Sequence, residues 1–383
     1  HTLLSSDIYS APNQGLNRLI VTLLYKTKAS HLSSSSKISD PDSGARNTNT
    51  SPSTLLTHAT SNSHISTSQK TILSSNCYIS SDSLTCFASI ISSILQLEDP
   101  SSLAITYRYL DDLKQPSAVE IVLSLGSTLE FPSISNLREN SLISQFTTDW
   151  NIDITFQRES VFRRYPRLVC FDMDSTLIEE EIIDIIAASI KVEAEVSEIT
   201  KRAMNGELDF CDSLRARCKL LVGVNEDIFF KMRDVVTPNK GLKGLLKALK
   251  QMGVRTAVFS GGFLPFVSWF AKEFGIDYAY ANSLAVTDGL LTGELEGSIV
   301  DAERKKELLY EIAAKEGIGL DQVVAIGDGA NDLLMLNAAG LGVAWNAKPI
   351  VQMHAQARLN RDSLLDLLYF FGLTSEEIKS FIS

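Results

Sequence analysis

Hydrophobic and polar positions divide the chain into two regions with different patterns. In the first region, apolar runs of strand length flank segments whose apolar residues recur at helical spacing. The predicted order is strand, helix, strand, strand, helix and strand, over residues 17–26, 82–96, 103–110, 118–125, 134–149 and 151–157. This order is typical of a split βαβ unit, and it predicts a small α+β domain of ferredoxin-like fold over residues 17–158.

A polar stretch interrupts this first domain. Residues 27–75 are rich in Ser and Thr and contain few bulky apolar residues. Such a segment cannot bury enough apolar surface to offset the entropy that it would lose on ordering. We therefore predict a disordered Ser/Thr-rich insertion at about 27–75.

The second region, residues 166–383, alternates strands with amphipathic helices. Strands are predicted over 168–171, 254–259, 323–326 and 341–344, and helices over 241–251, 263–274, 301–316 and 331–339. A hairpin is predicted around Asp288-Gly289. Alternation of this kind indicates an α/β fold, with a Rossmann-like parallel sheet covered by helices on both faces. Residues 180–236 are helical almost throughout, which predicts a helical cap inserted into this domain.

Composition narrows the classes of partner and compartment. The net charge of −11, without any run of Lys or Arg, argues against binding to nucleic acid or an anionic membrane. No apolar run approaches the roughly 20 residues of a membrane span. The cysteines are odd in number and lack CxxC spacing, which favours a reducing, cytoplasmic location. Because the sequence begins at His1 rather than Met, organellar targeting stays open.

Four polar stretches lie where predicted strands end or on the helices beside them. They are Asp172-Met173-Asp174-Ser175-Thr176, Ser260-Gly261-Gly262, Lys305, and Gly327-Asp328-Gly329-Ala330-Asn331-Asp332. The carboxyl ends of parallel strands meet at one edge of a sheet, so groups more than 150 residues apart can converge there. Each stretch alone has an ordinary structural explanation, such as a turn, a helix N-terminal acid or a surface lysine. We interpret their joint occurrence as one site.

The residue types indicate the chemistry of that site. Clustered carboxylates repel one another and need a cation, and an all-oxygen set of ligands suits Mg²⁺ better than Zn²⁺. Glycine amides and the Lys305 ammonium are donors for phosphate oxygens. His354 is the only histidine after residue 65, so a Ser–His or Cys–His mechanism is not expected there. An Asp carboxylate is then the natural nucleophile and gives an aspartyl-phosphate.

The four stretches resemble the four motifs of the haloacid-dehalogenase-type phosphotransferases. The matching segments read FDMDSTL, SGG, the lysine and GDGAND. Glu181 and the cap segment 209–215 are similar to the phosphoserine phosphatases in particular, and the resemblance runs from about Leu168 to the end of the chain. By pattern only, the first domain resembles the ACT-like appendage of the longer bacterial-type enzymes. Its Ser-rich insertion departs from that family and puts a regulatory role in doubt.

The resemblance implies roles in phosphoryl transfer. Asp172 is expected to attack phosphorus, and Asp174 to protonate the leaving oxygen and later to take a proton from water. Mg²⁺ is expected to be held by Asp172, by the main-chain carbonyl of Asp174 and by Asp328. The residues expected to bind phosphoryl oxygens or to support the site are Ser260, Gly261, Lys305, Asn331 and Asp332.

The resemblance also implies residues that select the substrate. Glu181 is expected to meet the ammonium group of phosphoserine and Arg215 its carboxylate, because a guanidinium fork matches a carboxylate. Met204 and Phe210 are expected to close the pocket against water.

The implied function is Mg²⁺-dependent hydrolysis of O-phospho-L-serine to L-serine and phosphate, the last step of L-serine biosynthesis. Two alternatives stay open: the same chemistry on another small phosphomonoester, and an amino-acid-binding regulatory protein with an inactive phosphatase domain. The first domain has two interpretations as well. It is either a structural appendage through which the chain forms a homodimer or a regulatory module that binds an amino-acid effector.

Overall fold

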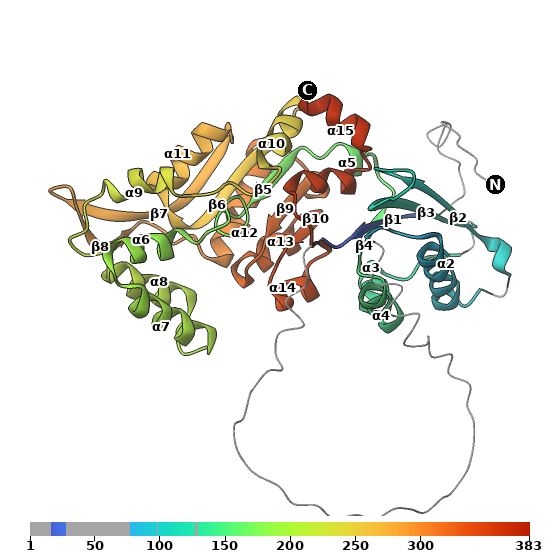
Figure 1. Cartoon of the computed structure of the whole chain (residues 1–383), viewed down its shortest axis with the longest axis horizontal. Helices are drawn as coiled ribbons and strands as arrows, with labels where there is room; N and C mark the ends of the chain where they lie inside the picture. Colours follow the sequence, from blue (N-terminus) through green and yellow to red (C-terminus); the bar gives the residue numbers. More distant parts are fainter. Residues whose placement is uncertain (1–16, 28–76, 98, 127–128) are drawn as a thin grey trace, which may run out of the picture.

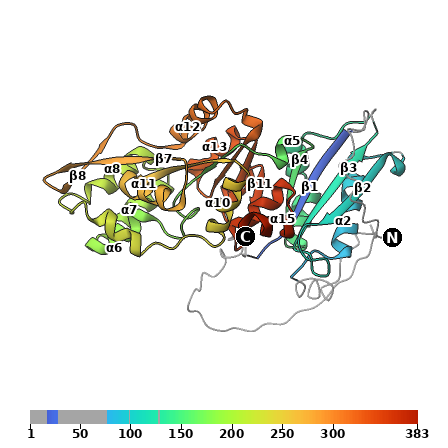
Figure 2. The same cartoon turned by 90° about the horizontal axis from the view of Figure 1, so that it is seen from above.

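The computed structural model describes residues 17–27, 77–97, 99–126 and 129–383. The described part has a four-stranded sheet at one end, a seven-stranded sheet in the middle and a group of helices at the other end (Figures 1 and 2). The predicted insertion lies outside the described residues from residue 28 onward. Within the described residues, no helix combines the length and the apolar character needed to cross a membrane.

The four-stranded sheet is antiparallel and has the order β2-β3-β1-β4. Its strands are β1 (Asn17–Tyr25), β2 (Leu103–Tyr109), β3 (Ala118–Leu125) and β4 (Ile152–Arg158). One face packs under α2 (Ser81–Leu95), α3 (Ile134–Glu139) and α4 (Ser141–Asp149), where the rings of Phe87 and Phe146 lie 5.6 Å apart. This is the ferredoxin-like arrangement that the sequence predicts.

The helix predicted over 134–149 is wrong in one respect, because Asn140 divides it into α3 and α4. Asn140 has an extended backbone, and its side chain accepts a hydrogen bond from the Leu142 amide at 2.9 Å. It therefore caps α4 rather than continuing α3.

The seven-stranded sheet has the order β11-β10-β9-β5-β6-β7-β8, and it is parallel except for β8. Its strands are β5 (Leu168–Phe171), β6 (Arg255–Phe263), β7 (Tyr278–Thr287), β8 (Leu290–Glu296), β9 (Val323–Gly327), β10 (Leu341–Trp345) and β11 (Ala357–Leu359). Alternate residues of β5 enter two separate apolar clusters, so both faces of the sheet are covered. The predicted α/β fold is confirmed.

Helices cover the two faces in two groups. One face packs under α10 (Leu242–Gln251), α11 (Leu264–Phe274), the 3₁₀ helix η6 (Leu364–Phe371) and α15 (Ser375–Ile382). The other face packs under α12 (Ala302–Lys315), α13 (Leu333–Ala338) and α14 (Pro349–His354). The sequence did not predict β11, α14, η6, α15 or the short helix α5 (Val161–Arg164).

The predicted cap is present between β5 and α10. It consists of α6 (Ile182–Ile190), α7 (Glu193–Met204), α8 (Phe210–Lys219) and α9 (Ile228–Lys231), followed by the 3₁₀ turn η3 (Met232–Asp234). The first three of these helices lie with β8 at the end of the molecule opposite the four-stranded sheet (Figures 1 and 2).

Candidate active site

The site begins where β5 ends. The Asp172 amide still continues the sheet, donating to the Ile326 carbonyl at 2.9 Å. The chain then turns tightly: the Leu177 amide returns to the Met173 carbonyl at 2.8 Å, and Ser175 has a φ of 57°. A left-handed residue of this kind is uncommon outside glycine and often marks a functional turn. The turn leaves the side chains of Asp172 and Asp174 at the edge of the sheet.

A buried lysine forms ion pairs with aspartates of the first and fourth motifs. The Lys305 ammonium, which has no exposed surface, lies 2.5 Å from Asp172 Oδ1 and 2.7 Å from Asp332 Oδ1. Burial alone would lower the pKa of Lys305, but Asp172 and then Asp332 more than offset that effect and raise it above its ordinary value. Lys305 is therefore a fixed cation beneath the Asp172 carboxylate, and it does not line the cavity described below.

The fourth motif, residues 327–332, is held in place by its own backbone. The second Asp332 oxygen accepts from the Gly329 amide at 2.9 Å, and the Asp328 carboxylate accepts a long 3.3 Å hydrogen bond from the Thr176 hydroxyl. A Cβ on Gly327 would stand 2.4 Å from Asp332 Cγ. Only glycine allows the Asp332 side chain to fold back in this way.

These carboxylates form a group suited to a cation. Oxygen atoms of Asp172, Asp328 and Asp332 all lie within 4.8 Å of one another. Burial, and then the charge of Asp332, raises the pKa of Asp172 well above its ordinary value and the pKa of Asp328 to about 7. One lysine therefore does not neutralise the group. A hard divalent ion fits it, because the donors are all oxygen and excess negative charge remains.

A cavity of about 310 Å³ opens above the group and beneath the cap. The core contributes Asp172, Asp174, Gly261, Gly262, Phe263, Asp328, Gly329, Asn331 and Lys348, and the cap contributes Glu181, Ile183, Asp184, Thr200, Phe210, Leu214 and Arg217. The structure thus brings together most of the predicted residues across both parts of the fold.

Arg215 is not among the lining residues, contrary to the prediction. Its side chain is 56% exposed and pairs with Asp212 on the outer surface of α8. Two helical positions correspond to about 200° of rotation, so Arg215 and Arg217 point in nearly opposite directions. Arg217 shares one face of α8 with Phe210 and Leu214, at spacings of seven and three residues. This periodicity was visible in the sequence and could have identified Arg217.

Ser260 also differs from expectation. The sequence placed Ser260-Gly261-Gly262 after a strand, but β6 continues through Phe263. The Ser260 hydroxyl is buried behind the cavity wall, where it donates to Asp174 at 3.2 Å and accepts from the Gly262 amide at 2.8 Å. Gly261 and Gly262 form the wall itself. A Cβ on Gly261 would stand 3.0 Å from the Phe210 ring, so this glycine lets the cap residue approach.

Asp174 and Glu181 are the two remaining acids of the predicted set. Asp174 accepts hydrogen bonds from the Ile182 amide at 2.9 Å and from Ser260, yet burial raises its pKa. Glu181 lines the cavity, and its carboxylate accepts a hydrogen bond from the Ser175 hydroxyl at 3.1 Å. Partial loss of hydration within the cavity, and then the charges of Asp174 and Asp328, raise the pKa of Glu181 to about 7.

The sequence reasoning missed Lys348. It follows the end of β10, whose carboxyl end lies at the same edge of the sheet as those of β5 and β9. Lys348 lines the cavity, and its positive charge counteracts the rise in the pKa of Asp328 and of Glu181. The side chain of Met204, at the end of α7, lies outside the described part of the chain.

Comparison with known proteins gives consistent matches. A family model of the haloacid dehalogenase-like hydrolases matches residues 166–340. The phosphoserine phosphatase of Streptomyces coelicolor is 46% identical over 229 residues, which are 60% of this chain and 56% of that protein. The probable phosphoserine phosphatase of Schizosaccharomyces pombe is 43% identical over 234 residues, which are 61% of this chain and 78% of that protein. The chain thus spans less than two thirds of the Streptomyces relative.

Solved structures of phosphoserine phosphatases also match this chain. Two phosphoserine phosphatase structures, one bound to substrate and one holding a phospho-aspartyl intermediate analogue, each match with a TM-score of 0.51 and 43% identity. Each match covers 54% of this chain and 98% of the solved chain.

Proposed function

We propose, from the premise that this chain belongs to the haloacid dehalogenase-like hydrolases of phosphoserine phosphatase type, that it hydrolyses O-phospho-L-serine to L-serine and phosphate. One observation carries the proposal. Asp172, which a buried lysine holds in place, faces a cavity to which the cap contributes the acids Glu181 and Asp184 and the cation Arg217. Phosphoserine carries an ammonium group, a carboxylate and a phosphate. The cavity has groups of opposite charge for the ammonium group and the carboxylate, and a cation site for the phosphate.

Phosphoryl transfer in this proposal uses the two acids of the β5 turn. An Asp172 oxygen attacks phosphorus, the bond from phosphorus to the serine oxygen breaks, and an aspartyl-phosphate forms. Asp174 gives its proton to the departing serine oxygen, and its raised pKa favours the protonated form that this step needs. Asp174 then takes a proton from the water that hydrolyses the aspartyl-phosphate, which restores both acids.

A Mg²⁺ ion is part of the proposal. Asp172 and Asp328 are the carboxylates that would hold it, with the main-chain carbonyl of Asp174. Asp332 is less suited to direct contact, because Lys305 and the Gly329 amide already engage both of its oxygens. When bound, the ion neutralises the clustered negative charge and polarises the phosphoryl group. Gly261 and Asn331 line the same cavity and are the proposed donors to phosphoryl oxygens, whereas the Gly262 amide already donates to the Ser260 hydroxyl.

Substrate selection rests on the cap. Glu181 meets the ammonium group, and Arg217, rather than Arg215, meets the carboxylate. Phe210 closes the cavity against Gly261 and excludes water from the reacting atoms.

Replacement of Arg217 tests this assignment. Arg217→Ala should raise the KM for phosphoserine by about 10- to 100-fold, because a charge-assisted hydrogen bond contributes about 1.5–3 kcal/mol. Steady-state phosphate release measures the effect. Turnover of p-nitrophenyl phosphate, which has no carboxylate, should change little. Arg215→Ala is the matched control on the same helix and should leave the KM within about twofold of the parent. Equal effects of the two variants would contradict the assignment.

The proposed function is tested by assaying phosphoserine against a panel of small phosphate esters. We expect phosphoserine to have the highest kcat/KM, with phosphothreonine next and esters lacking the amino-acid group far behind. EDTA should stop phosphate release, and added Mg²⁺ should restore it, because the carboxylates of the site need a cation. Equal rates across the panel, or activity indifferent to chelation, would refute the proposal.

Partners and compartment remain part of the proposal. A homodimer is supported by β2, which is an edge strand of its sheet and exposes 55% of Tyr107. A cytoplasmic location is supported by the cysteines, all of which are free. An amino-acid effector at the four-stranded sheet stays a prediction.

A further inference from the structure

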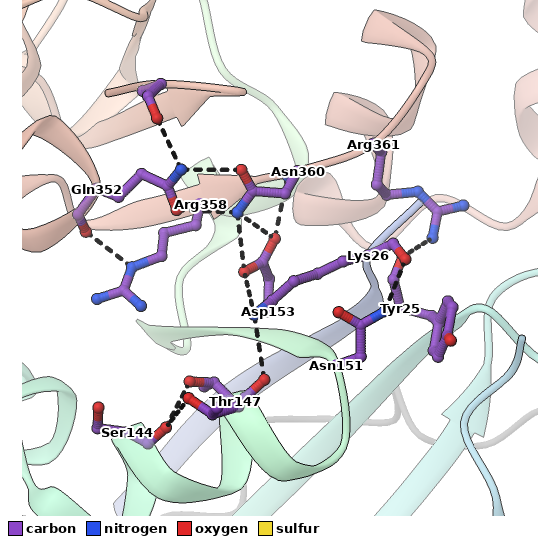
Figure 3. A network of polar contacts seen from close by, with 12 residues as sticks. Tyr25, Lys26, Ser144, Thr147, Asn151, Asp153, Gln352, Arg358, Asn360 and Arg361 are labelled. Atoms are coloured by element: carbon purple, nitrogen blue, oxygen red, sulfur yellow. Dashed lines mark hydrogen bonds and ion pairs between the residues drawn. The ribbon is translucent and has the colours of Figure 1, made fainter. Parts of the chain in front are cut away.

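The edges of the two sheets meet at a buried polar cluster. Strand β4 of the four-stranded sheet contacts β11 of the seven-stranded sheet. Figure 3 shows the side chains that lie between them, with Asp153 of β4 facing Asn360, the residue after β11. Asp153 and Asn360 are 1% and 2% exposed. Buried polar groups are costly unless their hydrogen bonds are satisfied, so the contacts of this cluster determine its orientation.

Asp153 is a fixed acceptor in this cluster. Its carboxylate accepts from the Asn360 main-chain amide at 3.0 Å and from Asn360 Nδ2 at 3.0 and 3.2 Å. Lys26 lies 3.8 Å away on the side of the four-stranded sheet and donates to the Thr147 carbonyl at 3.1 Å. Both oxygens of Asp153 accept from Asn360, so Asn360 directs its amide nitrogen toward Asp153.

The orientation of Asn360 fixes the next residue, Gln352 of α14. The two side-chain amides bond reciprocally: Asn360 Nδ2 donates to Gln352 Oε1 at 3.0 Å, and Gln352 Nε2 donates to Asn360 Oδ1 at 3.1 Å. Gln352 Nε2 also donates to the Ala347 carbonyl at 2.7 Å. Every N–H of the two amides is therefore used, and a flip of Gln352 would oppose two oxygens at Ala347.

Ala347 is next in sequence to a residue of the candidate active site. The next residue, Lys348, lines the cavity, and its main-chain amide donates to the Asp328 carbonyl at 3.2 Å. The Lys348 carbonyl in turn accepts from the Gln352 amide at 3.1 Å. A continuous chain of hydrogen bonds thus runs from Asp153 of the four-stranded sheet to Lys348 and Asp328 at the cavity.

We propose that Asp153, Asn360 and Gln352 are positioning residues through which the four-stranded sheet holds Lys348 and the Asp328 loop in place for catalysis. The inference rests on the proposed function for the reaction and extends it to residues outside the cavity. In this inference the four-stranded sheet supports catalysis directly, without binding an effector.

The test uses the full protein chain and interrupts the hydrogen-bond path at its start, Asp153, and at its middle, Gln352. Asp153→Asn turns one of the two acceptor oxygens into an NH₂ donor, so that the side chain no longer only accepts, and Gln352→Met keeps the size of the side chain but removes the links to Asn360 and Ala347. Each variant should weaken Mg²⁺ binding, measured by calorimetry, by about 10-fold, and should raise the KM for phosphoserine by a similar factor, as outer contacts of metal ligands typically do. The double variant should lose little more than either single variant, because both interrupt one path.

The control is another contact between the four-stranded sheet and the C-terminal part of the chain. Arg108 donates to the Gly372 carbonyl at 2.7 Å, and that contact does not lead to the cavity. Arg108→Gln should lower thermal stability about as much as Gln352→Met but leave Mg²⁺ affinity and KM within about twofold of the parent. Unchanged Mg²⁺ affinity in Gln352→Met, additive effects in the double variant, or an equal effect of Arg108→Gln would overturn the inference. An inactive parent chain that still binds Mg²⁺ would refute the proposed function instead, because calorimetry needs no turnover.

Discussion

Asp172→Asn should reduce phosphoserine turnover by about 10⁴-fold or more, because an amide cannot attack phosphorus as a carboxylate does. The fold should survive. The asparagine keeps the size of the aspartate, Lys305 keeps its 2.7 Å ion pair with Asp332, and one of the repelling carboxylates is removed. We therefore expect a melting temperature within a few degrees of the parent. Phosphate release and thermal unfolding by circular dichroism measure the two expectations.

A control with the same chemical change separates the role of Asp172 from a general loss of charge. Asp212 lies on the exposed side of α8, where it pairs with Arg215. Asp212→Asn should keep activity and stability close to those of the parent. Turnover by Asp172→Asn above about one hundredth of the parent rate would refute Asp172 as nucleophile. Inactivity together with unfolding would instead assign it a structural role.

The parallel core was predictable because local and long-range signals agree there. Short apolar runs such as 168–171 end in polar loops at one sheet edge, and the alternation of elements specifies a parallel sheet. The chain after residue 345 was less predictable. The strand β11 has three residues, and η6 is apolar except for Asp366, so neither shows a clear period.

Within the site, errors arose where a side-chain direction rather than a residue type decides the role. Arg215 and Arg217 are equally suited to a carboxylate, and only the phase of α8 distinguishes them. Lys348 lacks a motif of its own, and the position of β10 in the sheet brings it to the cavity. The contact of Asp153 with Asn360 joins residues 207 positions apart, which no local pattern encodes.

Lys305→Met should have the largest effect on stability, together with a severe loss of activity. The substitution removes the only side-chain ammonium that contacts Asp172 and Asp332 in the described part of the chain, and Asp332 has no exposed surface. Breaking a buried ion pair from one side costs about 3–5 kcal/mol, because the remaining charge stays buried and unpaired. The free energy of unfolding from urea titration measures this loss. We expect kcat to fall by about 10³-fold, since the nucleophile also loses its bracing cation. Lys306→Met, which removes an exposed ion pair with Glu303, is the matched control and should be nearly neutral.

The stability defect of Lys305→Met should depend on pH in metal-free buffer with chelator. Without the ammonium, the charge of Asp332 acts on the buried Asp172 carboxylate uncompensated, and the pKa of Asp172, which burial already raises in the parent, rises further above its value in the unfolded chain. An acid with a raised folded pKa stabilises the fold below its unfolded pKa and loses that contribution as pH rises through the folded value. The difference from the parent should therefore be largest near about pH 8 and shrink toward about pH 5. A difference that is constant over this range would mean that Lys305 stabilises the protein by packing, and that the two carboxylates are not held as charged partners.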